Sequence, residues 1–537
     1  MTAKTKILMF AMDACEPDIA RRLAASGEMP NLARLLAESA TATSRNPYAM
    51  FPGTLWTSFY TARSAARTGF HCWEEVTLDY QRRLTSPLEV RGTPFWETLS
   101  DAGKRVCVID VPHSRAATPL NGVQVCEYAV HDRHFGFHTQ PPHLAKELDA
   151  QFGLHPILGV DAYSTKEWSP DDYVLREGQH RTRDENRALL TGLLDGIDHK
   201  TRVSLHLLDQ GGWDLFLTVF GESHSVGHQM WHLHDPKHRW HDAELAAELG
   251  SPIEAVYKRF DRALGEHLAR VDAGTTAFVL LSHGMGPRYE ANHLLHEILR
   301  LLDRAEDRGV GGSSLMRTAK RAWAHAPGPV RNLVLPRMLP ALRRRVATTP
   351  LPTATNWAEP EERVRQRFYV SPNNLVFGGI RINLVGREPN GRVHPGAEYD
   401  RVCARLAEDL LALVNLDTGA PVVRAVTRAE DHYDREENDT LPDLFIDWSH
   451  EAPVETVWSP RTGLVYGPDN HWRTGDHRPD GLLLASGPGI TPGAALPDIS
   501  STDLGASLSA RLGVELTGDV DGRPIPWIAT APTEAPV

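Results

Sequence analysis

The chain has 537 residues, of which 41% are hydrophobic and 23% charged, proportions that are ordinary for a soluble globular enzyme. This length supports a large core, with either a second domain or a large insertion in one domain. The 69 acidic residues outnumber the 57 basic ones and give a net charge of −12, which argues against a broad nucleic-acid-binding face.

The cysteines and the apolar segments indicate a cellular location. The five cysteines are dispersed and contain no CxxC pair, which argues against a disulfide framework and a structural cysteine–zinc site. The apolar run near the N-terminus is too short for a signal peptide, because Asp13 interrupts it. No uninterrupted apolar stretch is long enough to span a membrane. We therefore expect a soluble cytoplasmic protein.

Short apolar runs alternate with helical segments along much of the chain. The runs at 6–13, 105–110, 213–220 and 276–282 are typical of buried parallel strands. Helical periodicity occurs at 17–40 and at 253–270. The alternation predicts a three-layer α/β/α fold with a central, mostly parallel sheet. Ligands of such sheets gather at the carboxyl ends of the strands.

The texture of the sequence changes after about residue 303. The segment from there to 356 is proline-rich, with a basic cluster at 317–345 that either steers a polyanion or is a solvated helical face. We predict a first part of the catalytic core at 1–302 and an inserted cap or lid at 303–395. The core is then completed at 396–537, which includes a loose C-terminal tail.

Six histidines fall within the stretch FGESHSVGHQMWHLHDPKHRWH at 220–241, namely His224, His228, His232, His234, His238 and His241. This stretch directly follows the predicted strand at 213–220. His224 and His228 are four residues apart, so their imidazoles share one face of a helix. That pair suits a metal site, because neutral imidazole is a common zinc ligand. The alternative is a solvated, histidine-rich surface helix.

Other polar residues stand at strand ends or in turns. Asp13 ends the first predicted strand, as a metal ligand or as an ordinary helix N-cap. Thr54 lies in a Pro-Gly turn before a predicted helix at 55–61. Ser282 and His283 follow the strand at 276–282 in LLSHGMG, and His477 lies in GDHRPDG.

The order and spacing of these pieces resemble the alkaline phosphatase superfamily, in its type I phosphodiesterase/nucleotide pyrophosphatase branch. The resemblance extends to VIDVPHS, INLVGREPNG and the closing GRPI. It implies a Thr or Ser nucleophile, for which Thr54 is the best match and Thr57 and Ser58 are weaker candidates. Thr54 would lie at a helix start, where free N–H groups favour a phosphate.

The resemblance also implies two divalent metal ions, zinc with manganese as the alternative. Asp13, Thr54, Ser282 and His283 match the ligands of one ion, and His224, His228 and His477 match those of the other. His224 and Ser282 stand where the family has Asp. The site therefore carries two fewer negative charges, which favours anionic substrates and weakens the first metal position.

We therefore expect a metal-dependent phosphodiesterase or nucleotide pyrophosphatase in which Thr54 attacks phosphorus. The expected partner is a small phosphorylated substrate, with a nucleotide as one option, and neither nucleic acid nor membrane. The alternatives are a phosphomonoesterase or phosphonate hydrolase of the same superfamily, and a degenerate member that binds a phosphorylated ligand without turnover. The oligomeric state is not predicted.

Two further features have two interpretations each. Asn383, Arg387 and Glu388 of INLVGREPNG either shape a substrate or cap region or form a polar turn. The tryptophans Trp56, Trp73 and Trp231 either stack on a base or pack in the core and at its rim.

Overall fold

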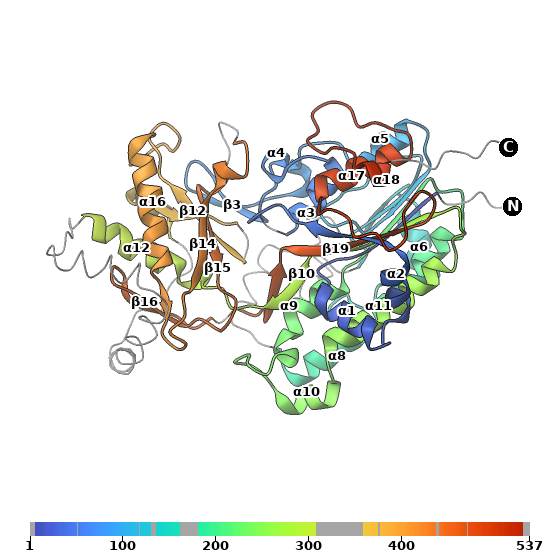
Figure 1. Ribbon diagram of the computed structural model, residues 1–537, viewed down its shortest axis with the longest axis horizontal. Coiled ribbons are helices and arrows are strands. Elements are labelled where there is room, and N and C mark those ends of the chain that lie inside the picture. Colours follow the sequence, from blue (N-terminus) through green and yellow to red (C-terminus); the bar gives the residue numbers. More distant parts are fainter. Residues whose placement is uncertain are drawn as a thin grey trace.

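The computed structural model of the protein describes residues 6–50, 52–117, 119–129, 136–161, 181–307, 358–373, 376–435, 440–469 and 471–529. The predicted basic cluster at 317–345 lies outside these residues. The chain forms two lobes, a larger one around a nine-stranded sheet and a smaller one around a four-stranded sheet (Figure 1).

Nine strands form the main sheet, and in sheet order they are β20 (Ile499–Ser500), β2 (Ala40–Arg45), β19 (Asp480–Ser486), β9 (Thr276–Leu281), β1 (Ile7–Met12), β8 (Leu215–Phe220), β5 (Val106–Ile109), β6 (Gly122–Cys126) and β7 (His138–Gln140). The strands from β9 to β6 all run parallel. β19 runs antiparallel to both of its neighbours, and β7 runs antiparallel to β6. Because helices cover both faces, β1, β8 and β9 are buried at every position, which explains their continuous apolar sequences.

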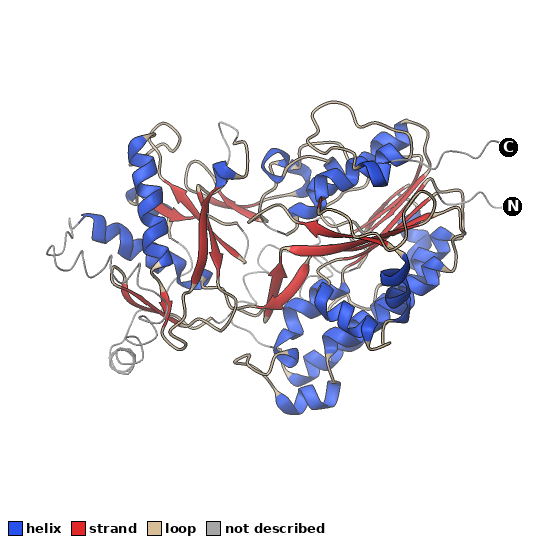
Figure 2. Ribbon diagram, in the orientation of Figure 1, coloured by secondary structure: helices blue, strands red, loops and turns tan. Residues whose placement is uncertain are grey.

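Helices cover both faces of this sheet (Figure 2). Phe10 and Met12 of β1 belong to the core on one face, whereas Met9 and Ala11 belong to the core on the other. The first face carries α1 (Pro17–Ala25), α2 (Pro30–Glu38), α8 (Arg183–Leu208), α9 (Glu222–His234) and α11 (Pro252–Leu268). The second face carries α3 (Thr54–Thr61), α5 (Phe95–Asp101), α17 (Ser501–Arg511) and α18 (Pro526–Ala529). The predicted three-layer α/β/α fold is confirmed.

Shorter elements complete the larger lobe. They are α4 (Ala65–Thr68), the hairpin of β3 (Glu74–Val76) and β4 (Arg82–Leu84), a 3-10 helix at Pro87–Glu89, α6 (Leu144–Phe152) and α10 (Ala243–Leu249). The turn between the strands of this hairpin contacts the smaller lobe.

The smaller lobe contains an antiparallel sheet and a second, three-stranded sheet. The first has the order β11 (Phe368–Val370), β12 (Phe377–Ile382), β15 (Leu444–Trp448), β14 (Val423–Arg428), and the second has β13 (Val414–Asn415), β16 (Thr456–Ser459), β17 (Gly463–Tyr466). Among the described residues, the helical elements of this lobe are α12 (Asn292–Asp307), α15 (Pro360–Arg365), α16 (Ala397–Leu411) and a 3-10 helix at Ala429–Asp431. The chain enters the lobe after β10 (Gly284–Pro287) and leaves it at β18 (Gly475–Arg478), and these two strands pair antiparallel.

The predicted division of the chain places a boundary between residues 395 and 396. In the structure, β12 and β15 lie on opposite sides of that position and pair with each other in one sheet. The strands of the smaller lobe continue to Tyr466, and the main sheet resumes at β19. The division at 395 therefore stays a prediction that rests on the change in sequence composition alone.

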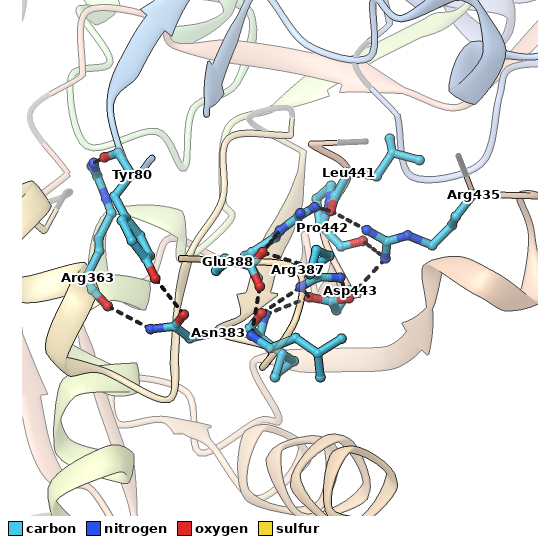
Figure 3. A network of polar contacts seen from close by, with 12 residues as sticks. Tyr80, Arg363, Asn383, Arg387, Glu388, Arg435, Leu441, Pro442 and Asp443 are labelled. Carbon is cyan, nitrogen blue, oxygen red and sulfur yellow. Dashed lines mark hydrogen bonds and ion pairs between the residues drawn. The ribbon is translucent and has the colours of Figure 1, made fainter. Parts of the chain in front are cut away.

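A buried network of arginines and carboxylates lies within the smaller lobe (Figure 3). Both terminal nitrogens of Arg387 donate to Asp443, one to each carboxylate oxygen, at 2.7 Å. The side-chain nitrogens Nε of Arg387 and Arg381 each donate to Oε1 of Glu388 at 2.8 Å. Arg435 donates to Oδ1 of Asp443 at 3.0 Å. Burial alone would raise the pKa of Asp443, but the hydrogen bonds and charges of these arginines lower it to about 2.

The same segment contacts the turn between β3 and β4. The hydroxyl of Tyr80 donates to Oδ1 of Asn383 at 2.9 Å, and Arg363 donates to the Tyr80 carbonyl at 2.7 Å (Figure 3). Asn383, Arg387 and Glu388 therefore make structural contacts within the smaller lobe and to the hairpin. Hydrogen bonds and ion pairs of the INLVGREPNG segment connect parts of the smaller lobe, and the contact of Asn383 with Tyr80 connects this lobe with the hairpin.

We predict that Arg387→Ala lowers the free energy of unfolding by about 3 kcal/mol, because it removes the main partner of a buried carboxylate. Urea denaturation followed by circular dichroism measures this change. The matched control is Arg405→Ala, since Arg405 pairs with Glu306 at 2.8 Å but has a side chain that is 55% exposed. That control should change stability by less than about 1 kcal/mol. Equal effects of the two substitutions would contradict a structural role for the network.

Candidate active site

The parallel pairing of the central strands brings three of the predicted pieces together. The backbone N–H of Asp13 donates to the carbonyl of Phe220, the last residue of β8, at 2.8 Å. The N–H of Ser282 donates to the carbonyl of Met12, the last residue of β1, at 3.0 Å. Asp13, the start of α9 and Ser282 are therefore neighbours at one edge of the sheet, as the sequence predicts. Helix α9 lies beside β10, where the two lobes meet (Figure 1).

Three buried histidines converge at this edge. His224 and His228 come from α9, and His477 comes from β18. One ring nitrogen of each lies within 4.8 Å of those of the other two, and no other group of at least three His, Cys, Asp or Glu ligand atoms meets this criterion among the described residues. Nε2 of His228 lies 3.1 Å from Nε2 of His477. Two nitrogen ligands of one tetrahedral zinc lie about 3.3 Å apart. The arrangement therefore fits a divalent ion.

The protonation of these rings also suits metal binding. Nδ1 of His228 lies 2.8 Å from the carbonyl of Gly475, so it carries the proton and leaves a lone pair on Nε2. Burial, together with the charges of Arg473 and His477, holds the pKa of His228 well below its usual value. Nδ1 of His477 lies 3.2 Å from Oδ1 of Asp476. Such a carboxylate behind a histidine fixes the ring and strengthens it as a ligand.

The remaining histidines of the predicted cluster lie outside this group. Nδ1 of His232 is 3.3 Å from the hydroxyl of Thr474, and Nδ1 of His234 is 3.1 Å from the hydroxyl of Ser251. Nδ1 of His241 lies 2.7 Å from the carbonyl of His232. His238 is buried and packs beside Trp240 and Tyr289. Two of the six histidines in the segment thus belong to the group.

The side chains of Asp13, Ser282 and His283 form a second cluster. The hydroxyl of Ser282 donates to Oδ1 of Asp13 at 3.0 Å and accepts the N–H of Ala14 at 3.0 Å. It also lies 2.9 Å from Nδ1 of His283. The ring of His283 packs against that of His477, with 4.6 Å between centroids. The two clusters are therefore adjacent, but this hydroxyl has its single proton and both lone pairs engaged. The fit to an ion is accordingly poorer here.

Thr54 is the first residue of α3 and is fully buried. Two residues along the helix, the indole Nε1 of Trp56 donates to Oδ1 of Asp13 at 2.8 Å, which holds the first turn of α3 beside β1. The hydroxyl of Thr57 donates to the carbonyl of Thr54 at 3.2 Å, and that of Thr61 donates to the carbonyl of Thr57 at 2.6 Å. The Thr57 hydroxyl is therefore hydrogen-bonded within the helix, and Thr54, at the helix start, stays the predicted nucleophile.

The contact of Trp56 with Asp13 was not predicted from the sequence. Of the two interpretations of Trp56, base stacking and core packing, the structure shows a side chain buried in the core. A buried indole N–H normally finds an acceptor, so its position two residues after Thr54 offered a weak signal. The acceptor itself is 43 positions away in sequence and becomes evident only from the packing of α3.

A cleft of about 580 Å³ lies between the lobes. Its lining includes Glu16 and Arg478 of the larger lobe and Arg424 and His450 of the smaller one. Oε2 of Glu16 accepts the N–H of Met285 at 2.8 Å, and Arg478 directly follows His477. The cleft thus borders β10 and β18, the second of which carries His477.

The model of the type I phosphodiesterase/nucleotide pyrophosphatase family matches residues 7–480 of this chain. The chain belongs to this family. It is thus a member of the alkaline phosphatase superfamily and a phosphoric ester hydrolase, and dependence on divalent metal ions is general in the family. Among curated protein sequences, none matches this chain.

Solved structures with low sequence identity align with the chain over most of its length. Phosphonoacetate hydrolase from Sinorhizobium meliloti 1021 in complex with phosphonoformate is 14% identical, with 94% of each chain covered and a TM-score of 0.46. An inactive murine ectonucleotide pyrophosphatase/phosphodiesterase 5 in complex with AMP is 10% identical, with 96% of this chain and 98% of that chain covered and a TM-score of 0.48. The human protein of that name is 11% identical, with 97% and 98% covered and a TM-score of 0.45.

Among the described residues, no helix is both long and apolar enough to cross a membrane. All five cysteines are buried thiols.

We predict that His228→Ala lowers the metal content of the purified protein, because it removes one of three imidazole ligands. Elemental analysis after dialysis against a weak chelator measures the change, and the affinity should fall at least about 100-fold. His234→Ala is the matched control, since it removes a histidine of the same helix that contacts Ser251 instead. Loss of metal from both variants alike would contradict the assignment of the three-histidine group.

Proposed function

We propose that the protein is a metal-dependent phosphodiesterase or nucleotide pyrophosphatase with Thr54 as its nucleophile. The observation that supports this proposal most directly is the group of three buried histidines, which lies beside Asp13 at the carboxyl edge of the sheet in a chain of this family. Thr54 is the first residue of α3, and a hydrogen bond from Trp56 of the same helix to Asp13 holds this helix beside the histidines' edge of the sheet. The expected substrate is a small phosphorylated molecule, for which a nucleotide is one option.

The proposed reaction has two displacements at phosphorus. The oxygen of Thr54 gives up its proton and forms a bond to phosphorus. At the same time the bond to the leaving group breaks, and the leaving oxygen, of an alcohol or of a phosphate, takes up a proton. Water then attacks the phosphothreonine ester, which releases the phosphate product and restores the threonine. The positive end of the α3 helix dipole would favour the anionic oxygens. A divalent ion at the histidines would neutralise charge and act as a Lewis acid.

The identity of the bound metal and a cytoplasmic location belong to this proposal as well. Zinc, with manganese as the alternative, and a count of two ions are predictions from the sequence. The three-histidine group supports one of the two positions, and the set of Asp13, Thr54, Ser282 and His283 is the predicted second position. The free cysteines agree with a reducing compartment.

We expect Thr54→Ala to lower the hydrolysis of bis(p-nitrophenyl) phosphate at least about 10³-fold, since no other hydroxyl replaces the nucleophile. Release of p-nitrophenol from the metal-loaded protein measures the rate. Thr57→Ala is the matched control, because its hydroxyl contacts backbone carbonyl oxygen within α3 and should not react. Activity that survives in Thr54→Ala and disappears in Thr57→Ala would reassign the nucleophile.

The same assay separates the alternative functions. Faster turnover of p-nitrophenyl phosphate than of the diester would favour a phosphomonoesterase, and turnover of phosphonoacetate would favour a phosphonate hydrolase. Binding of a phosphate ester by the metal-loaded protein without turnover of any of the three would favour the non-catalytic alternative. The serine at position 282, where the family has a carboxylate, is the feature that supports this last alternative.

A further inference from the structure

We propose that the chain holds a single tightly bound divalent ion, at the three histidines, and that a hydrogen-bonded group fills the position predicted for the second ion. That group consists of Asp13, Trp56, Ser282 and His283. The inference rests on the proposed function, because it concerns the metal centre of the same site.

Ser282 is the central member of this group. Its Oγ accepts the N–H of Ala14 at 3.0 Å and donates its proton to Oδ1 of Asp13 at 3.0 Å. Since that proton is used, the 2.9 Å contact with Nδ1 of His283 is a hydrogen bond in which the imidazole donates. A hydroxyl has one proton and two lone pairs, so Ser282 has no lone pair left for a cation. A carboxylate at this position would have brought both a charge and additional lone pairs.

Uncharged hydrogen-bond donors stabilise the negative charge of the Asp13 carboxylate. Its Oδ1 accepts hydrogen bonds from Nε1 of Trp56 at 2.8 Å and from the hydroxyl of Ser282 at 3.0 Å. Nδ1 of His283 lies 3.9 Å from the same oxygen. Asp13 is almost fully buried, and a buried carboxylate must be compensated by such donors or by a cation. In this structure hydrogen-bond donors supply part of the compensation that an ion would otherwise give.

The donor count separates the two positions. The three histidines provide three neutral nitrogen ligands to one ion and leave a fourth coordination place for substrate or water, as in catalytic zinc sites. At the other position the Ser282 hydroxyl is already hydrogen-bonded and cannot act as a ligand. The strong metal ligands that remain there are the carboxylate of Asp13 and the imidazole of His283. Two such donors and the weak hydroxyl of Thr54 make a poor site for a hard or borderline dication.

The charges lead to the same conclusion. Asp13 is the only acid among the seven predicted ligands, and Asp476 behind His477 adds a second negative charge nearby. These two carboxylates compensate one dication at most, since Nε of the buried Arg288 lies 3.8 Å from Oδ2 of Asp476. A second dication would leave two positive charges uncompensated in a buried site, where opposing charges interact strongly. The histidine at position 224 thus suits a one-ion centre. Compared with the Asp of the family, it removes a negative charge from the site but still supplies a metal ligand.

The direct test is the number of ions per chain. The full-length protein is equilibrated with excess Zn²⁺, desalted and analysed by inductively coupled plasma mass spectrometry and by native mass spectrometry. We expect one zinc per chain in the wild-type protein and two in Ser282→Asp, where the restored carboxylate releases the hydrogen-bonded group. Ser282→Ala is the matched control and should hold one ion. Two tightly bound ions in the wild-type protein, or a folded Ser282→Asp variant that still holds one, would overturn the proposal.

A second measurement does not depend on the folding of that variant. Wild-type protein saturated with Co²⁺ should give the paramagnetic resonance spectrum of an isolated high-spin ion, and a spectrum of two coupled ions would contradict the inference. Hydrolysis of the diester is measured on the same samples. An active protein with two ions overturns only the single-ion inference, whereas an inactive protein with one ion overturns only the proposed hydrolase function.

Discussion

The parallel pairing of β1 with β8 and β9 is the constraint on which the site depends. Hydrogen bonds from Asp13 to Phe220 and from Ser282 to Met12 extend this pairing one residue beyond the strands. A shift of either register would separate the aspartate, the histidine helix and the serine by several ångströms, because successive residues of a strand lie about 3.3 Å apart. The apolar residues that line both faces of these strands fix the register, so the core itself positions the polar groups.

The elements that could be predicted from the sequence are those whose hydrophobic pattern directly reflects their burial in the fold. The continuous apolar runs of β1, β8 and β9 are required by burial on both faces, and their polar ends therefore identify the edge where ligands gather. The two histidines on α9 follow from the spacing of four residues along a helix. His477 could be placed only by resemblance, since no local pattern relates a residue on β18 to α9.

Other features depend on packing between distant segments and could not be predicted. The indole of Trp56 finds Asp13 only because α3 lies across the end of β1. The three partners of Ser282 follow from the geometry of two strand ends, whereas the sequence shows only that the residue type differs from the family. Strands and helices alternate in both lobes and give similar patterns of hydrophobicity, so the sequence contains no local signal for the limits of the smaller lobe.

The paired strands β10 and β18 have a consequence for how the protein is made. They are the entry to and exit from the smaller lobe, and His477 lies on the exit strand. The contact between His228 and His477 joins residues 249 positions apart. During synthesis from the N-terminus, the first two histidines are therefore in place long before the third, and the whole smaller lobe emerges in between. An ion held by all three imidazoles, as proposed, would be bound only after that lobe has been completed, so metal loading would be a late event in the maturation of the chain.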